Sequence, residues 1–195
     1  MNSSSVRVGY DGIARCAWVG TDTEYARYHD EEWATPLHGD QPLFEKICLE
    51  GFQAGLSWIT ILKRRPAFRE VFYDFDVHRV AELGPDDVER LMSDSRIIRN
   101  RAKIEATIGN ARATLQLCAE APGALDALVW SFAPPSGRRP LVLGEVPAVT
   151  PESTALSKAL RSAGFRFVGA TTMYALMQSA GLVDDHVAEC WRAKA

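Results

Sequence analysis

Cysteine is scarce, since the 195 residues hold four, at positions 16, 48, 118 and 190. So few cysteines, so widely spaced, exclude a disulfide framework in a chain of this length. No apolar run reaches 18 residues, so no membrane span is expected. The first residues, "MNSSSVRVGYDGIAR", are polar and lack the apolar segment of a secretion signal. We therefore expect a reduced, cytoplasmic protein that has no membrane partner.

Period-two alternation, the mark of a half-buried strand, is also nearly missing outside "RPLVLGEV". No internal repeat is evident. The composition is ordinary for a globular domain, with 47% apolar and 24% charged residues. A net charge of −3 argues against a protein that binds nucleic acid over its whole surface, but it allows a local basic patch.

Helical spacing dominates the rest of the chain. "QPLFEKICLEGFQAGLSWITILKRR" repeats apolar residues at helical steps, and Gly51 and Gly55 indicate a break or a close approach to the backbone. Pro85 predicts a helix start in "GPDDVERLMSD", and Thr150 caps a helix that ends at Gly164. Further helices are expected in "RAKIEATIGNARATLQL", "APGALDALVWSF" and "TTMYALMQSAG". The fold class is all-α, with residues 1–13 as a disordered extension and residues 14–195 as a single domain.

His186 and Cys190, four residues apart near the end of the sequence, are a common zinc half-site if they lie on one face of a helix. Cys16 and His29 offer a second half-site, and together the four make a Cys₂His₂ set. The alternative is a buried cysteine and a histidine that is only hydrogen-bonded. Spacing alone leaves both open.

Six longer motifs carry a resemblance to a known family: "RCAWV", "YARYHDEEW", "CLEGFQAGLSWITILKRR", "IIRNRAKIEATIGNARA", "LSKALRSAGFRFVGATTMY" and "MQSAGLVDDHVAEC". From about Arg15 to Cys190, the chain closely resembles 3-methyladenine DNA glycosylase I. The resemblance implies an all-helical helix–hairpin–helix glycosylase fold, with two lobes and a base pocket between them. It also implies one structural Zn²⁺ that joins the N- and C-terminal segments through Cys16, His29, His186 and Cys190.

The implied substrate is double-stranded DNA that contains a base alkylated at N3 of adenine. By the same resemblance, Glu50 is the catalytic carboxylate and Trp58 stacks on the flipped base. Tyr28 matches a second polar contact, and Tyr25 lies one helical turn before it. The remaining expected pocket residues are Gln53, Trp18 and Trp33. Taken without the resemblance, Glu50 could be a solvated helix carboxylate, and the aromatic residues could be plain core.

A basic stretch, "SDSRIIRNRAKIEATIGNAR", matches the family's hairpin, whose backbone N–H groups hold DNA phosphates. The expected DNA-backbone contacts are Arg96, Arg99, Asn100, Arg101 and Lys103. This hairpin lacks the usual glycines before Gly109, but the turn is still possible, because Asn100 can adopt left-handed geometry. The alternative is a solvated basic helix face.

These observations lead to a monofunctional DNA-3-methyladenine N-glycosylase, because no lysine is placed as a Schiff-base nucleophile. Strand cleavage is not expected, and no spare apolar helix face suggests an oligomer, so we expect a monomer. A non-catalytic protein that binds alkylated DNA is the alternative. A zinc hydrolase is disfavoured, because four protein ligands leave no open position on the metal.

Overall fold

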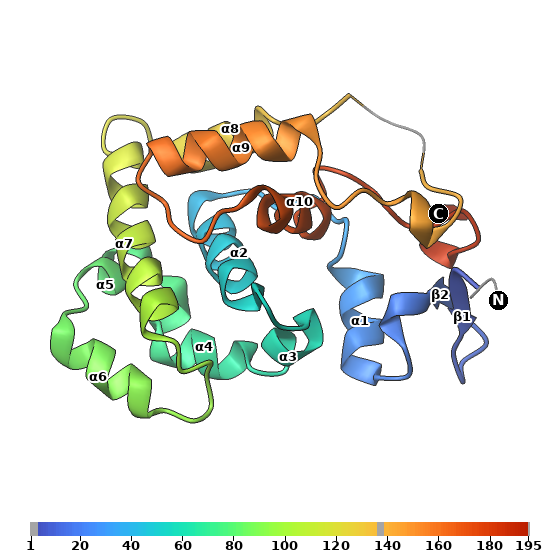
Figure 1. The fold of residues 1–195 in the computed structure, drawn as a ribbon, viewed down its shortest axis with the longest axis horizontal. Coiled ribbons are helices and arrows are strands. Elements are labelled where there is room, and N and C mark those ends of the chain that lie inside the picture. The colour runs from blue at the N-terminus through green and yellow to red at the C-terminus, as the bar shows by residue number, and fades with distance from the viewer. Residues whose placement is uncertain (1–3, 136–138, 195) are drawn as a thin grey trace.

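Helices form most of the chain, as the apolar periodicity predicts (Figure 1). The computed structural model describes residues 4–135 and 139–194. The α-helices are α1 (Thr23–Glu31), α2 (Asp40–Gln53), α3 (Trp58–Leu62), α4 (Arg65–Val71), α5 (Val77–Ala81), α6 (Pro85–Ser93), α7 (Arg101–Cys118), α8 (Ala124–Trp130), α9 (Pro151–Ser162) and α10 (Ala170–Ser179). Short 3₁₀ turns are η1 (Ala17–Val19), η2 (Tyr73–Phe75), η3 (Leu143–Glu145) and η4 (Trp191–Lys194). None of the helices described is long and apolar enough to cross a membrane.

Local capping chemistry sets the ends of α9 as predicted. The Thr150 hydroxyl accepts a hydrogen bond from the backbone N–H of Ser153, and the Ser153 hydroxyl oxygen accepts one from the N–H of Thr150. Pro151 occupies the first turn, where its missing N–H costs nothing. After the helix, Gly164 adopts a positive φ of 94°, which allows the chain to turn away.

The two glycines of the Asp40–Leu62 region have the two effects that were expected. Gly55, with φ of 81°, lies in the break between α2 and α3. Gly51 lies within α2, where a Cβ would come 3.2 Å from Cβ of Phe167. A side chain at residue 51 would therefore force α2 away from the segment before α10.

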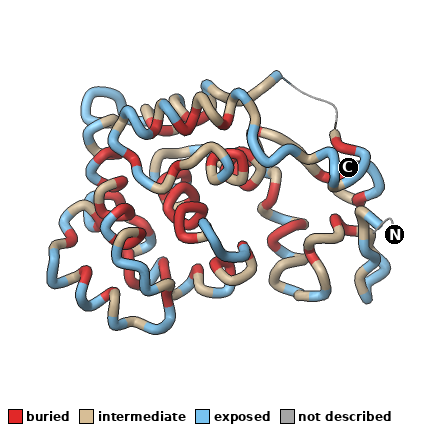
Figure 2. Tube along the Cα trace, viewed as in Figure 1, coloured by how far each residue is buried: buried red, intermediate tan, exposed pale blue. Residues whose placement is uncertain are grey.

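Helix α2 lies at the centre of the core, in contact with α7, α8 and α10 (Figure 1). Figure 2 shows that most of α2 is buried. On one side of it, Phe52 lies 4.5 Å from Phe68 between ring centroids, and Phe68 stacks with Phe72. The core therefore holds α2 firmly, and any side chain that α2 directs into a cavity has a fixed position.

Two expectations about the chain ends are wrong. Residues 6–8 are not disordered, because β1 (Val6–Val8) pairs antiparallel with β2 (Ala14–Cys16), with Val6 opposite Cys16. Residues 1–3 of the expected extension lie outside the described residues. His186 and Cys190 are not on a helix either, since residues 184–187 are irregular and Cys190 follows a turn closed by its N–H to Val187 O. Figure 1 shows the two chain ends near each other, and η4 contacts β2.

Candidate active site and metal centre

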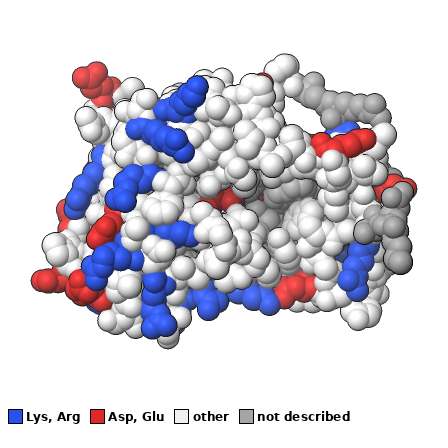
Figure 3. Space-filling view, in the orientation of Figure 1, with Lys and Arg blue, Asp and Glu red and all other residues white. Residues whose placement is uncertain are grey.

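A cavity of about 370 Å³ opens where α1, α2, α3 and α10 meet. Figure 3 shows a hollow near the middle of this face, with acidic atoms at its bottom. The lining side chains are Trp18, Tyr25, Tyr28, Trp33, Glu50, Gln53, Trp58, Leu143, Val146, Ala175, Gln178, Ser179 and Asp185. The structure thus brings Glu50 and all six residues expected to bind the base to one cavity.

Aromatic rings form much of the cavity wall. The ring centroids of Tyr28 and Trp58 lie 5.4 Å apart, and those of Trp18 and Tyr25 lie 4.9 Å apart. Trp33 continues the cluster, 5.0 Å from Trp18. The planes of these paired rings differ by 45° to 70°, so the wall offers several separate aromatic faces, on each of which a planar ligand can stack.

Two carboxylates line this cavity, Glu50 and Asp185, and Glu50 is the buried one, only 2% exposed. Its Oε1 accepts a hydrogen bond of 2.8 Å from the Ser179 hydroxyl, whereas Oε2 has no partner among the described residues. Burial raises the pKa of Glu50 to about 7, although Lys46 and the Ser179 hydrogen bond oppose that rise. The solvated-carboxylate alternative is therefore excluded. Neither Lys46 nor Ser179 was singled out from the sequence, although Lys46 precedes Glu50 by one helical turn.

The polar atoms of the aromatic wall remain neutral donors. Burial, and after it the charge of Glu50, raises the pKa of Tyr28 well above its usual value. The same two causes raise the pKa of Tyr25 to about 12. Trp58 Nε1 is buried without a partner in the described part of the chain. Trp58 Nε1 and Glu50 Oε2 are thus a donor and an acceptor that a ligand can satisfy.

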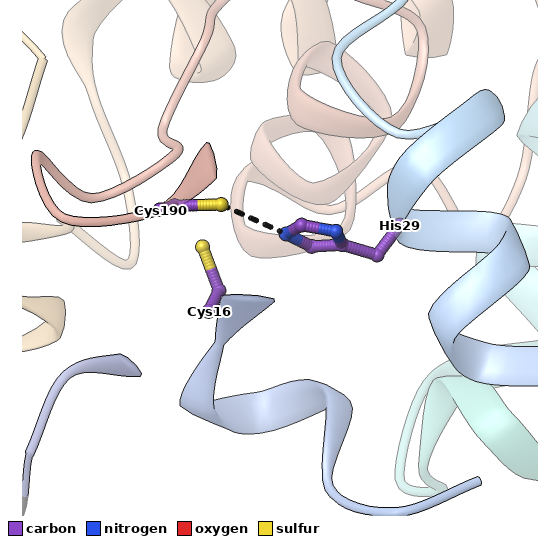
Figure 4. A group of neighbouring side chains, drawn as sticks. All are labelled: Cys16, His29 and Cys190. Carbon is purple, nitrogen blue, oxygen red and sulfur yellow. Dashed lines mark hydrogen bonds between the residues drawn. The ribbon is translucent and has the colours of Figure 1, made fainter. Parts of the chain in front are cut away.

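A candidate metal centre lies beside this wall. Figure 4 shows Cys16 from the end of β2, His29 from α1 and Cys190 from the C-terminal segment, with their side chains directed toward one another. Their ligand atoms all lie within 4.8 Å of each other, and all three residues are fully buried. The neighbouring Cys16 thiol, and after it His29, favours the ionised form of Cys190 and lowers its pKa, while the pKa of Cys16 is raised. A lowered pKa favours the thiolate, which is the form that binds a metal.

The fourth expected ligand, His186, lies next to this group, with its ring centroid 4.8 Å from that of His29. Its Nε2 is buried and has no hydrogen-bond partner among residues 4–135 and 139–194. In both histidines a carboxylate contacts the Nδ1 atom: Asp30 lies 2.8 Å from His29 Nδ1, and Asp184 lies 2.7 Å from His186 Nδ1. A carboxylate on Nδ1 leaves Nε2 to face a metal, so the donor set fits one.

The residues expected to contact DNA divide into two groups. Arg96, Arg99 and Arg101 are exposed in or beside the connection 94–100 between α6 and α7. Lys103 is not, because it is only 7% exposed and its ammonium donates to Phe52 O at 2.8 Å and Ala54 O at 2.6 Å. The prediction of a phosphate contact at Lys103 is therefore wrong. Its side chain instead binds carbonyls at the C-terminus of α2.

Asn100 does not adopt the left-handed geometry that its residue type allows. The residue has φ of −125°, and its side chain accepts a hydrogen bond from the Lys103 N–H, which makes it the N-cap of α7. On the surface, Lys and Arg side chains gather on the half of the face that carries α6, α7 and α9, to one side of the hollow (Figure 3).

A deep cavity with aromatic walls and one buried carboxylate defines a binding site for a flat, positively charged ring. The methyladenine glycosylase profile matches residues 18–193. DNA-3-methyladenine glycosylase 1 of Escherichia coli K12 is 51% identical over 180 residues, which are 91% of this chain and 96% of the relative. DNA-3-methyladenine glycosylase of Haemophilus influenzae is 49% identical over 183 residues, 90% of this chain and 96% of the relative.

The solved structures agree. A crystal structure of 3-methyladenine DNA glycosylase I has a TM-score of 0.88 at 47% identity and covers 91% of this chain and 98% of its own. The chain belongs to the methyladenine glycosylase family.

Proposed function

We propose that the protein excises 3-methyladenine from alkylated double-stranded DNA and leaves an abasic site. The observation that carries this proposal is Glu50, a buried carboxylate in a cavity walled by aromatic rings, one of whose oxygens has no partner among the residues that the structure describes. The similar proteins in the comparisons are named for the same activity. A carboxylate in such a cavity favours a cationic ring over neutral adenine.

The chemistry follows from the charge of the lesion. Alkylation at N3 makes the base cationic, so it leaves as a neutral molecule when the glycosidic bond breaks and takes the bonding electron pair. Water then adds to C1′ of the sugar and releases a proton. The rings of Trp58 and Tyr28 hold the flipped base by stacking, and Glu50 stabilises positive charge on the base and then on the sugar. A strong general acid is not required.

We further propose that the reaction stops at the abasic site. Strand cleavage by a glycosylase uses an amine that attacks C1′ to form a Schiff base. Two lysines lie near the cavity. Lys103 donates to two backbone carbonyls, and Lys46 lies against the rings of Tyr28 and Trp58. Neither amine is among the groups that line the cavity.

For DNA binding, we propose that α6, residues 94–100 and α7 act as the family's helix–hairpin–helix element. Arg96 pairs with Asp94 and Glu70, and Arg101 pairs with Glu89, all through exposed or half-exposed side chains. Exposed ion pairs contribute about 0–1 kcal/mol each, so the arginines can exchange these partners for phosphates at little cost. Arg99 and the N-terminus of α7 lie at the same place.

We also propose that Cys16, His29, His186 and Cys190 hold one structural Zn²⁺. The support is the convergence of three ligands, the Nε2 of His186, which has no partner in the described part of the chain, and the two carboxylates that fix the imidazoles. Zinc would join β2 and α1 to the C-terminal segment, and four protein ligands would leave it no catalytic position. Because His29 follows Tyr28, the same centre would hold α1 against the cavity. The monomeric state and the cytoplasmic location stay predictions.

The test is release of free base from methylated duplex DNA, with initial rates corrected for spontaneous loss. Native protein should release 3-methyladenine but not 7-methylguanine. Glu50→Gln removes a charged interaction and Trp58→Ala removes a stacking surface, so each should slow release by about ten- to a hundredfold. The matched control is Glu120→Gln, at an exposed glutamate after α7 that should leave the rate unchanged. If native protein binds alkylated DNA with zinc bound but releases no base, the non-catalytic alternative holds instead.

A further inference from the structure

Lys46 is a buried cation that takes no part in the proposed reaction. It lies on α2, one helical turn before Glu50, and is 8% exposed. Its ammonium lies 5.3 Å from the ring centroid of Tyr28 and 5.4 Å from that of Trp58. Both rings line the cavity, whereas Lys46 does not.

A second cavity, of about 240 Å³, lies next to the first, and Lys46 lines it together with Glu32, Glu45 and Arg65. Ser179, whose hydroxyl donates to Glu50 Oε1, lines both cavities. Charged side chains therefore lie next to the base pocket, and Lys46 is the cation that α2 contributes to them.

A carboxyl group buried in an aromatic cavity prefers to be protonated unless a cation faces it. The other titratable groups that line the cavity do not provide one, since Tyr25 and Tyr28 of α1 are neutral and Asp185 is acidic. Lys46 is the charge that most strongly opposes the raised pKa of Glu50. In turn, burial lowers the pKa of Lys46, while Glu50 and then Glu32 raise it and Arg65 lowers it. Each group therefore opposes, without cancelling, the effect of burial on the other.

We propose that Lys46 is a positioning residue for base recognition: packed against the Tyr28 and Trp58 rings, it favours the ionised form of Glu50 before the base binds. A neutral Glu50 would present a hydroxyl to the ring and would lose its attraction for a cationic base. The inference rests on the proposed function, and it makes Lys46 the residue that sets the lower pH limit of activity.

The test compares native protein with Lys46→Met and Lys46→Gln, which both remove the charge. Base release is measured from pH 5.5 to 9.5. In both variants the midpoint of the acidic limb should move up by about one pH unit or more, the lower end of what an adjacent opposite charge produces. At pH 6 the rate should therefore fall by about tenfold, and at pH 9.5 it should return to within about threefold of the native rate. The control Lys158→Met, at an exposed lysine of α9, should leave the midpoint unchanged.

A second measurement does not depend on activity. The carboxyl carbon of Glu50 is followed by ¹³C NMR in protein labelled at glutamate and is assigned by its absence in Glu50→Gln. Its titration midpoint should lie near 7 in native protein and higher in both lysine variants. An unchanged midpoint, or a loss of activity that is equal at all pH values, would overturn the proposal. If native protein released no base, the proposed function would fail, and the NMR titration would still decide the role of Lys46.

Discussion

Replacement of Lys103 by methionine tests whether this residue is structural rather than a DNA contact. Its ammonium, 7% exposed, donates to Phe52 O and Ala54 O, two carbonyls at the C-terminus of α2 that would otherwise lack a helical partner. Hydrogen bonds to a charged group contribute about 1.5–3 kcal/mol each, so their loss costs about 3–6 kcal/mol. Part of this loss is offset, because the variant no longer has to bury the charge of the Lys103 ammonium. We therefore expect Lys103→Met to lower the free energy of unfolding by about 3 kcal/mol.

The assay is urea unfolding followed by circular dichroism, with thermal unfolding as a second readout. For a chain of this size, a loss of about 3 kcal/mol lowers the midpoint temperature by about 6–12 °C. Lys158→Met, on the surface of α9, is the matched control and should change stability by less than about 0.5 kcal/mol. If Lys103→Met were as stable as this control and instead weakened DNA binding with a smaller salt dependence, the phosphate-contact role would be restored and the structural reasoning refuted.

Three further predictions concern stability and metal content. Because the pKa of Glu50 rises from 4.5 to about 7, its ionisation costs the folded state increasingly between those pH values, up to about 3 kcal/mol. Glu50→Gln should therefore raise stability by about 1–3 kcal/mol at pH 8 in urea unfolding, and the gain should disappear toward pH 4.5. Gly181→Ala places a Cβ 2.5 Å from the backbone of Thr35 at a φ of 77°, so it should lower stability by more than about 3 kcal/mol in thermal unfolding. We expect elemental analysis to find one zinc per chain in native protein and none in Cys190→Ser, and limited proteolysis should cut the chain ends of the variant faster; equal zinc content would contradict the proposed ligand set.

The Glu50 and Lys46 predictions together describe a site in which function opposes stability. The carboxylate is held where ionisation is costly, and the cation that permits ionisation is itself buried. Such a loss of stability is expected in binding sites, because a pocket that recognises a charged ligand has to hold its own charged group away from water before the ligand binds.

Much of the fold followed from local sequence signals. The Thr150–Pro151 cap, the Pro85 start and the break at Gly55 each depend on groups within a few residues, and the structure has all three as predicted. The short hairpin was missed, because a three-residue strand has too few side chains to display an alternating pattern.

The membership of the site was also present in the sequence, since the family motifs carry Glu50, Trp58 and the candidate ligands. The burial, the hydrogen-bond partners and the pKa of each group were decided only by tertiary contacts. Lys103 looks like one more cation in a basic stretch, yet its partner Phe52 lies 51 residues away. Glu50 looks like a helix carboxylate, yet it is buried against Ser179, 129 residues away. Helix ends and motifs depend on neighbours in the chain, whereas burial, hydrogen-bond partners and pKa depend on which distant segments the fold packs together.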